Sequence, residues 1–403
     1  MASTPTESTD RRLILFIIPP GKAINGGILS IFSLCAESRA LYDIHRARVA
    51  LCTLPGTASY QWNDLFPNDE YVYAFDDLLE SIKSLQYLQI HVPEICSMAF
   101  CDALDKYRFV FDNIEDLSVN ILNQNIRLMP PPVEVARWFS LTSNVTQTTA
   151  HLRYTTQSLA DAYFLQTHHL SVYIDPTQYV KTPYESKDDL IVLSPDLVAE
   201  RDQIVSRIAA SFPRYRFVTV EGMKYEDYKR LVSRAKFTIT FGEGFDGYFI
   251  ETFLSGGVAF AVYNDEFFPS REYSTYPNVY ANYSDLLDHV TLDMHRFDNN
   301  AMYTSIVSKN SHFITQLYDH ATYRRKLASF YQGDFAYVPQ RGSGERLIGA
   351  IIADRDQREA SLRHRSKTRA FIRLVPGAKT LHQAISRRAS SRRQRASRPA
   401  RSL

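Results

Sequence analysis

The chain has 403 residues, of which 45% are hydrophobic and 22% are charged, and its formal net charge is +2. This length exceeds what one hydrophobic core comfortably holds, so we expect two domains. No apolar run approaches the roughly 20 residues that a membrane-spanning helix needs, and the run Leu13–Ile18 predicts a buried strand rather than a signal peptide. Four scattered cysteines fit neither a zinc module nor a disulfide framework, which indicates a reducing, cytoplasmic location.

Residues 1–10 are rich in Ser and Thr and are expected to be disordered. In residues 11–180, segments with the apolar or alternating pattern of a strand are followed by segments with helical periodicity. Two of the helical segments are Ile28–Ala40 and Ser97–Leu104. This order predicts a parallel, doubly wound α/β sheet in a Rossmann-like domain. The strands that we predict here are Arg12–Pro20, Arg48–Leu54, Glu70–Phe75, Tyr87–Val92, Tyr107–Asp112, Val145–His151 and Leu170–Asp175.

Polar side chains fall at the ends of several of these predicted strands. Ligands of parallel α/β sheets bind beyond the carboxyl ends of the strands, so these side chains are candidates for ligand contacts. For His151, the alternative of a buried or loop histidine is favoured. The candidates are His91, Glu94, Asp112, Asn113 and His151.

Gly26 and Gly27 stand where the first helix is predicted to begin. The free N–H groups of a helix N-terminus can bind an anion such as a phosphate. An ordinary tight turn between a strand and a helix explains the same two glycines equally well.

The segment Tyr179–Asp189 has the composition of a linker. A second set of strands that alternate with helices is predicted over residues 187–338. Its predicted strands are Leu190–Leu193, Tyr215–Val220, Phe237–Phe241, Val258–Tyr263 and Asn278–Tyr280. Its predicted helices are Leu197–Ser211, Tyr225–Ala235, Glu251–Leu254, Ser284–Asp288 and Tyr303–Tyr331. Two such sets predict two Rossmann-like domains that face a cleft.

Two glutamates flank the glycine-rich loop of the second set. Glu243 and Glu251 are separated by the seven residues GFDGYFI. A carboxylate near a helix N-terminus is suited to accept hydrogen bonds from two hydroxyl groups, as a ribose or a sugar ring offers. The alternative is structural: Glu243 and Asp246 decorate a turn, and Glu251 caps a helix.

This loop resembles the donor-binding signature of retaining GT-B glycosyltransferases, especially glycosyltransferase family 4. Glu243 and Glu251 match the two acids of the family in spacing, and Gly256-Gly257-Val258 matches the small residues before its last core strand. Four other stretches resemble the family in the same order: Gly26-Gly27, His91-Val92-Pro93-Glu94, Ser171–Tyr179 and Gly222-Met223. Asn120–Met129 and Asn144–His151 resemble glycosyltransferases of bacterial surface-polysaccharide clusters.

The resemblance implies a GT-B fold with an acceptor domain at 11–180 and a donor domain at 187–338. It implies transfer of a sugar from a nucleotide sugar to a polysaccharide or lipid-linked acceptor, with retention at the anomeric carbon. The nucleotide sugar is a substrate, so neither a cofactor nor a metal is expected. The alternatives are a nucleotide-sugar epimerase on the same fold and a catalytically inactive GT-B-like binding or scaffold protein.

The resemblance also implies roles for individual residues. Glu251 is expected to hold the ribose, and Glu243 and His91 form the expected catalytic pair at the donor sugar. The remaining expected donor contacts are Gly26, Gly27, Gly222, Met223, Gly244 and Phe245. Glu94, Asp112 and His151 remain candidate contacts for the acceptor or the donor.

One departure concerns the diphosphate. The family places an Arg and a Lys after the first strand of the donor domain, whereas here the stretch SPDLVAERD offers only Arg201. Arg201, or Lys224 from the next loop, is the expected substitute. The family's proline-rich turn between the two acids is also replaced, by Asp246-Gly247-Tyr248.

Residues 341–403 form a basic tail that we expect to be flexible or to lie on a membrane surface. From Ser361 to Leu403 there are 13 Lys or Arg residues and no acid. A solvated tail, an anchor to an anionic membrane at the inner face of the plasma membrane, and a nucleic-acid contact remain open, the last being disfavoured because aromatic residues are scarce. Asp354-Arg355-Asp356 and His168-His169 mimic metal-binding patterns, but we predict no metal at either.

Overall fold

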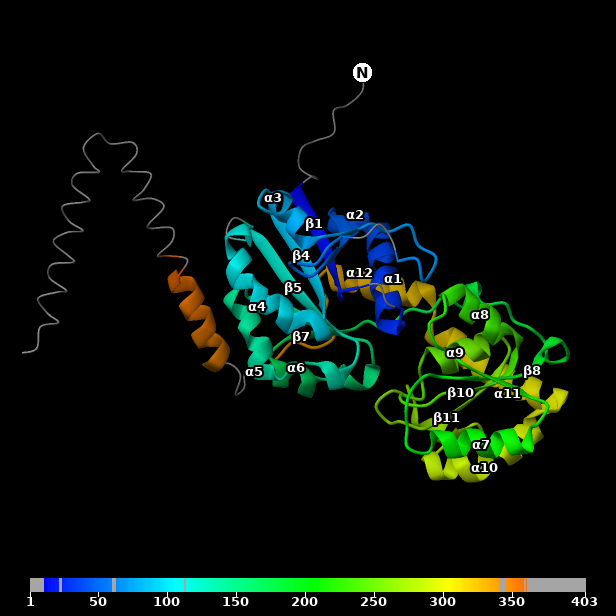
Figure 1. Ribbon diagram of the computed structural model, residues 1–403. Coiled ribbons are helices and arrows are strands. Elements are labelled where there is room, and N and C mark those ends of the chain that lie inside the picture. The colour runs from blue at the N-terminus through cyan, green and yellow to red at the C-terminus, as the bar shows by residue number, and fades with distance from the viewer. Residues whose placement is uncertain are drawn as a thin grey trace, which may run out of the picture.

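The computed structural model describes residues 11–21, 24–59, 63–111, 114–340, 346–358 and 360. The predicted disordered leader 1–10, the candidate residues Asp112 and Asn113, and the basic tail from Ser361 lie outside the described residues. Within them, the chain forms two α/β domains, each built on a parallel sheet, as the sequence predicts (Figure 1).

The first sheet has seven strands in the order β3-β2-β1-β4-β5-β6-β7, and neighbouring strands are parallel. Its strands are β1 (Arg12–Ile18), β2 (Arg48–Thr53), β3 (Val72–Tyr73), β4 (Tyr87–Pro93), β5 (Asp116–Asn123), β6 (Asn144–Thr149) and β7 (Gln166–His169). The helices of this part of the chain are α1 (Gly26–Ala40), α2 (Tyr42–His45), α3 (Leu79–Ile82), α4 (Glu94–Phe111), α5 (Pro132–Val135) and α6 (Gln157–Tyr163).

The second sheet has five strands in the order β12-β11-β10-β8-β9. Its strands are β8 (Asp188–Leu193), β9 (Arg216–Thr219), β10 (Ala235–Ile239), β11 (Val258–Val262) and β12 (Val279–Tyr280). The helices that follow β8 are α7 (Arg201–Ser211), α8 (Tyr225–Arg234), α9 (Gly247–Leu254), α10 (Tyr283–Phe297), α11 (Asn300–Leu317) and α12 (His320–Tyr331). Short 3₁₀ turns lie at Phe75–Leu78, Ile126–Leu128, Ala136–Ser140, Leu152–Tyr154, Pro176–Gln178, Tyr184–Ser186 and Arg271–Thr275.

Both faces of the first sheet are buried, and β1 shows why its sequence is apolar throughout. Leu13, Leu15 and Ile17 join the hydrophobic cluster on the α4 side. Ile14 and Phe16 join the cluster on the α1 side. A strand that is covered on both faces has no solvent-facing position, so it reads as a continuous apolar run.

The chain returns to the first domain after completing the second. Tyr323 and Leu327 of α12 pack in the same hydrophobic cluster as α1 and β1. The sequence predicts one helix over Tyr303–Tyr331, but α11 and α12 are separate, because the Asp319 side chain accepts the backbone N–H of Thr322 and caps a new helix.

Two predicted strands of the first domain are wrong. Tyr107–Phe111 belongs to α4, where Tyr107, Val110 and Phe111 are spaced as one buried helical face. The strand that was missed, β5, carries the buried polar residue Asn120 in its middle, which interrupts the apolar pattern. Leu170–Asp175 is not a strand either, since β7 has the polar sequence QTHH just before it.

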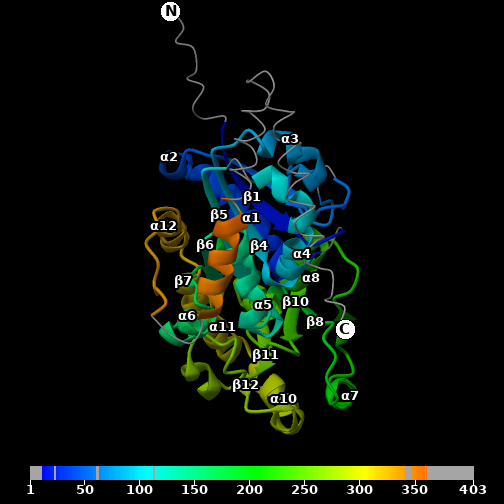
Figure 2. The same ribbon diagram turned by 90° about the vertical axis from the view of Figure 1, so that its left-hand side faces the viewer.

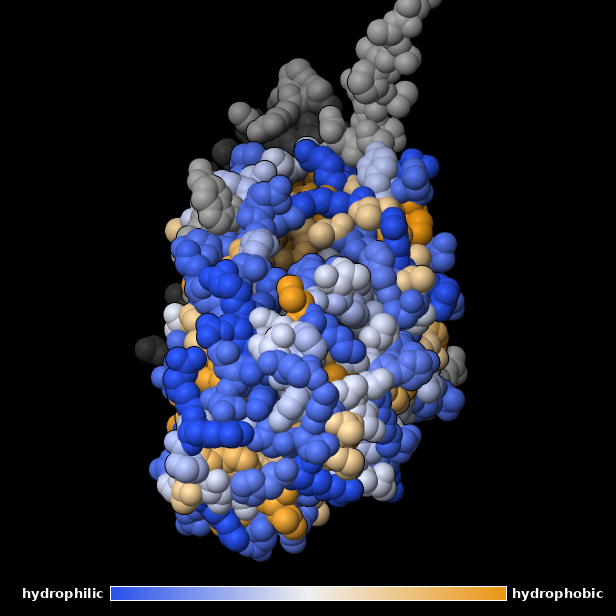
Figure 3. Space-filling model, turned by 90° about the vertical axis from the view of Figure 1, so that its right-hand side faces the viewer, coloured by the Kyte–Doolittle hydropathy of each residue, from blue (hydrophilic) through white to orange (hydrophobic). Residues whose placement is uncertain are grey.

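A further helix over residues 346–358 lies against the first domain and is orange in Figures 1 and 2. Ile348, Ile351 and Ile352 pack in the cluster on the α4 side. The opposite end of the molecule, seen in Figure 3, is mainly hydrophilic and carries only small, separate apolar patches.

Candidate active site

The turn between β10 and α9 carries Glu243. Gly244, the next residue, has a φ of +80°, and a Cβ there would lie 2.4 Å from the backbone oxygen of Val262 and 2.9 Å from the Phe268 ring. Glycine adopts this conformation without strain and lets the backbone approach this closely. The turn therefore packs directly against the end of β11, and this packing fixes the position of the Glu243 backbone.

Asp246 caps α9. Its Oδ1 accepts the backbone N–H of Phe249 at 3.0 Å, and its Oδ2 accepts the Thr240 hydroxyl at 2.5 Å. Burial raises the pKa of Asp246 to about 7, although these hydrogen bonds lower it. The alternative expectation that Glu251 caps this helix is wrong, because Glu251 lies in the second turn of α9.

Glu243 contacts the first domain. Asn125, in the loop after β5, donates from Nδ2 to Glu243 Oε1 at 3.0 Å. Burial raises the pKa of Glu243, the negative charge of Asp196 raises it further, and the positive charge of Arg127 lowers it. Glu243 therefore lies at the boundary between the two domains, within reach of charges from both.

Glu94 supports the loop that holds Asn125. It is the first residue of α4, only 3% exposed, and its two carboxylate oxygens accept the backbone N–H groups of Gln124 (3.2 Å) and Asn125 (3.0 Å). Burial raises the pKa of Glu94 to about 7. Glu94 thus positions a backbone turn, and its carboxylate is occupied by that turn.

The start of α1 meets the same turn. Gln124 Nε2 donates to the backbone oxygen of Gly27 at 3.2 Å, and a Cβ on Gly27 would lie 2.8 Å from Gln124 Oε1. Asn25 caps α1 by accepting the backbone N–H of Ile28 at 2.9 Å. Through these contacts the structure brings together the predicted Gly26-Gly27 turn, Glu94 and Glu243. The loop at residues 124–125, which was not predicted, connects them.

Glu251 is enclosed by tyrosines and is 5% exposed. Tyr225 donates from its hydroxyl to Glu251 Oε1 at 3.0 Å, and the Tyr225 hydroxyl is 2.6 Å from that of Tyr179. The second oxygen, Oε2, and the Tyr228 hydroxyl are both buried, and Tyr228 interacts with the Glu251 carboxylate. Burial raises the pKa of Glu251 to about 8, although the tyrosine hydroxyls lower it. Glu251 is therefore a buried carboxylate enclosed by tyrosine hydroxyls.

His91 does not join this group. Its ring is 1% exposed and stacks on Phe16, with ring centroids 4.4 Å apart. Asn120 Nδ2 lies 3.1 Å from its Nδ1, and the Tyr331 hydroxyl lies 3.4 Å from its Nε2. Burial lowers its pKa to about 3. β4 continues two residues beyond His91 to Pro93 and pairs His91 with Phe16, so the ring lies inside the domain and does not reach the site.

His151 does lie between the domains. It follows β6, and its half-buried ring packs edge-on against Phe267 of the second domain, with centroids 5.2 Å apart. Two ion pairs cross the boundary nearby: Arg127 with Glu266, and Arg153 with Asp265. The loops after β5 and β6 therefore contact the loop after β11.

No protein-family model and no curated protein sequence matches the chain. Solved structures do. Sucrose-phosphate synthase from Thermosynechococcus elongatus superimposes with a TM-score of 0.52 at 11% identity, over 80% of this chain and 99% of that chain. Alr3699/HepE from Anabaena, in complex with UDP-glucose, gives 0.51 at 10% identity, over 80% and 99%. A glycosyltransferase from Rickettsia africae gives 0.50 at 11% identity, over 80% and 98%. The chain has the GT-B fold.

Two loops of the second domain were expected to contact the nucleotide. The loop before Arg201 was expected to contact the phosphates, and the loop before α8 was expected to contact the base. Arg201 Nη2 donates to the backbone oxygen of Ser194 (3.1 Å) and to the Thr219 hydroxyl (3.3 Å), so its guanidinium joins the ends of β8 and β9. Its Nε is buried without a partner. Gly222, Met223 and Lys224 precede α8, and Gly222 and Lys224 are exposed. The next residue, Tyr225, donates its backbone N–H to Leu65 of the first domain at 2.7 Å.

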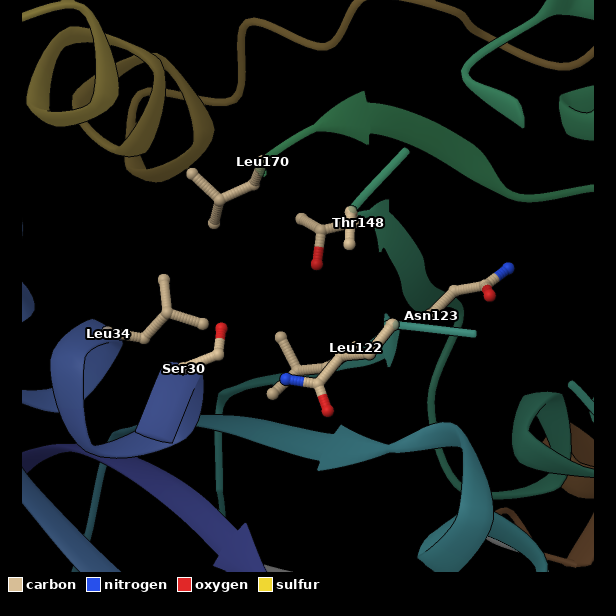
Figure 4. A pocket seen from close by; sticks show the side chains of 8 residues that line it. Ser30, Leu34, Leu122, Asn123, Thr148 and Leu170 are labelled. Atoms are coloured by element: carbon tan, nitrogen blue, oxygen red, sulfur yellow. The ribbon is translucent and has the colours of Figure 1, made fainter. Parts of the chain in front are cut away.

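A small pocket of the first domain lies between α1 and the ends of β5 and β6 (Figure 4). It has room for about one water molecule. Its lining residues are Ser30, Leu34, Leu122, Asn123, Gln124, Thr148, Ala150 and Leu170. Because Gln124 also holds Gly27, the pocket adjoins the turn described above.

Sequence reasoning missed three residues of the site: Asn125, Arg127 and Tyr225. Asn125 and Arg127 follow β5, so a correct assignment of that strand would have placed both at a carboxyl end. Tyr225 stands next to the expected base-binding loop, but no local pattern shows that it bonds Glu251.

The two histidines of the His168-His169 pattern contact other protein groups. His168 Nε2 faces the Lys326 backbone oxygen at 2.9 Å, and His169 Nδ1 accepts from Lys326 Nζ at 2.7 Å. In the described part of the chain, no group of three or more His, Cys, Asp or Glu residues is arranged to hold a metal ion. None of the helices among the described residues is long and apolar enough to cross a membrane.

Proposed function

We propose that this protein is a retaining glycosyltransferase of family 4 type. In this proposal it moves a sugar from a nucleotide-sugar donor to a polysaccharide or lipid-linked acceptor. The observation that carries the proposal is the pair Glu243 and Glu251 at the carboxyl end of the second sheet of a GT-B fold, with Glu243 bonded across the domain boundary to Asn125. The structural neighbour HepE is in complex with UDP-glucose, which supports a nucleotide sugar as the donor.

In this proposal, Glu251 and its tyrosines receive the ribose. The Glu251 carboxylate, to which Tyr225 already donates, is suited to accept hydrogen bonds from the hydroxyls of a ribose diol. The loop Gly222-Met223, which leads into α8, is placed to meet the base. Lys224 is exposed at the same end of α8 and is available to the donor.

Glu243 holds the hydroxyls of the donor sugar in this proposal, and the backbone of Gly244 and Phe245 meets the sugar or the phosphate. We assign the orienting role to His151 in place of His91. His151 packs on Phe267 of the second domain, whereas both ring nitrogens of His91 lie close to protein side chains in the interior. Electrostatic stabilisation of the leaving diphosphate comes from preorganised donors, among them the N-terminus of α1 at Gly26 and Gly27.

The proposed mechanism uses neither a metal nor a cofactor. The bond between the anomeric carbon and the phosphate oxygen breaks, and its electron pair stays on the phosphate. The acceptor hydroxyl oxygen forms the new bond on the same face, and its proton passes to the departing phosphate oxygen. Enclosure of the site between two domains favours transfer to the acceptor over hydrolysis.

Thermal-shift measurements with nucleoside diphosphates and their sugars test the proposal. We expect stabilisation by at least one nucleoside diphosphate and further stabilisation by its sugar, since a ligand that binds only the folded state raises the melting temperature. Incubation with the stabilising nucleotide sugar then separates the alternatives: an epimerase changes the sugar without releasing the nucleotide, and a scaffold protein changes neither. Absence of any shift would contradict the proposal.

We also propose that residues 361–403 bring the enzyme to the anionic inner face of the plasma membrane. The 13 bases without acids supply the attraction. A chain that ends at residue 360 should lose binding to vesicles that contain phosphatidylglycerol while keeping its affinity for nucleotides. Unchanged vesicle binding would contradict this placement.

A further inference from the structure

The leaving diphosphate requires a positive partner, and the second domain offers little. The loop after β8 carries Asp196 and Glu200 where the family resemblance leads one to expect an Arg and a Lys. Arg201, the base that follows, already donates to Ser194 and Thr219. This loop therefore adds negative charge at the place where the donor's phosphates would lie.

The acidic residues near this loop are close enough for their negative charges to interact. The negative charge of Asp196 raises the pKa values of both Glu243 and Asp246. A nucleoside diphosphate that enters beside these acids is repelled by them unless cations offset their charge. The cation that acts on Glu243 is Arg127, which belongs to the first domain.

Asn125 ties Arg127 to Glu243. Its Nδ2 donates to Glu243 Oε1 at 3.0 Å, and its Oδ1 accepts the backbone N–H of Arg127 at 3.0 Å. One amide side chain thus fixes both the carboxylate and the backbone from which the Arg127 side chain extends. Glu94 holds that loop in turn, through the backbone N–H groups of Gln124 and Asn125.

The Arg127 side chain is held by an ion pair that a ligand can replace. Its guanidinium donates to Glu266 Oε2, with Nε at 2.5 Å, and lies over the Phe267 ring, 5.3 Å from the ring centroid. The two side chains of the ion pair are 58% and 36% exposed. Exposed ion pairs of this kind contribute little to stability, whereas a guanidinium binds phosphate through two parallel, charge-assisted hydrogen bonds.

We propose that Arg127 binds the donor's diphosphate, exchanging Glu266 for the phosphate oxygens. This inference rests on the proposed function. The first domain then supplies a cation in addition to Arg201 and Lys224 of the second domain. As the bond from the anomeric carbon to the phosphate oxygen breaks, Arg127 stabilises the electron pair that remains on that oxygen.

Calorimetric titration of the full chain with UDP, GDP and ADP tests the assignment, without acceptor so that a phosphorylated acceptor cannot be the source of the effect. For the diphosphate that the wild type binds, Arg127→Gln should weaken affinity about tenfold, the loss expected for charge-assisted hydrogen bonds to phosphate. Glu266→Gln should strengthen affinity severalfold, because it removes the competing carboxylate. Arg127→Lys should keep the charge and recover part of the loss.

Arg153→Gln is the matched control, since Arg153 forms a similarly exposed ion pair with Asp265 across the same boundary. It should change affinity less than about twofold, as expected for an exposed ion pair. Equal losses in Arg127→Gln and Arg153→Gln, or a loss in Glu266→Gln, would overturn the assignment, because the ion pairs and not a free Arg127 would then matter. No binding of any diphosphate by the wild type would overturn the proposed function as well.

Discussion

Asn125 Nδ2 and Glu243 Oε1 are 3.0 Å apart, and this hydrogen bond joins the loop after β5 to the turn after β10. The loop of Asn125 follows a strand of one sheet and the turn of Glu243 follows a strand of the other, so the bond exists only when the two domains face each other as they do here. The position of the proposed sugar-binding carboxylate therefore depends on a side chain of the opposite domain.

Replacing Asn125 should impair turnover more than nucleotide binding. Asn125→Ala frees Glu243 Oε1 and should lower kcat about tenfold, while the affinity for bare nucleoside diphosphate changes less, since a hydrogen bond to a charged group contributes roughly 1.5–3 kcal/mol. Asn125→Asp should be worse, because it places a second negative charge beside Glu243. Steady-state kinetics and calorimetry check this. Asn300→Ala is the control, because Asn300 also bonds a glutamate, Glu185, but within a surface of the second domain.

Replacing Glu251 and replacing Glu243 should affect the affinities for two ligands differently. Glu251→Gln should weaken both the bare nucleoside diphosphate and the nucleotide sugar, since Glu251 is proposed to hold the ribose that both contain. Glu243→Gln should weaken only the nucleotide sugar, or lower kcat with little effect on the diphosphate. Titration of each variant with both ligands checks this. Equal losses for bare diphosphate in the two variants would contradict this division of roles.

Much of the fold follows from periodicity. The runs within β1, β2 and β8 are apolar because both faces of each sheet are covered, and such runs are readable in one sequence. β5 was not readable, because Asn120 is buried in its centre and bonds Thr148 and Thr146 of the neighbouring strand. A buried polar residue whose hydrogen bonds are made to the neighbouring strand interrupts the apolar sequence pattern, although the strand itself continues.

The site was predictable only in its local part. The spacing of Glu243 and Glu251 is a property of one turn and one helix, and so are the two glycines between them. The partners of the two acids, Asn125 and Tyr225, come from other elements and are set by how those elements pack. The place of His91 also depends on the register of β4 against β1, which no single segment reveals.

Gly244 should be intolerant of a side chain. Gly244→Ala puts a Cβ 2.4 Å from the Val262 backbone oxygen at a φ of +80°, so the turn must move or strain. We expect a loss of about 1–3 kcal/mol in the free energy of unfolding, the usual cost of such a conformation for a residue other than glycine. Gly349→Ala is the control, because nothing lies within 4 Å of a Cβ there. Chemical denaturation of both variants checks the difference, and equal stabilities would contradict it.

Glu251 should make the folded protein less stable as the pH rises. Burial raises its pKa from 4.5 to about 8, so between these values the folded state holds a proton that the unfolded state has released. Stability contributed by such a group falls with increasing pH across that window. Glu251→Gln, which cannot ionise, should therefore be more stable than the wild type at pH 8.5 by at least about 1 kcal/mol, the free energy of roughly one pKa unit.

The measurement is chemical denaturation of both proteins at pH 5.5, 7 and 8.5. Other buried groups also titrate: the raised pKa values of Glu94 and Asp246, both about 7, act in the same direction, whereas the lowered pKa of Lys187, about 7, acts in the opposite one. The difference between wild type and Glu251→Gln removes these shared contributions. It should grow from pH 5.5 to pH 8.5, and parallel curves would show that Glu251 is already ionised in the folded protein, stabilised by Tyr225 and its neighbouring hydroxyls.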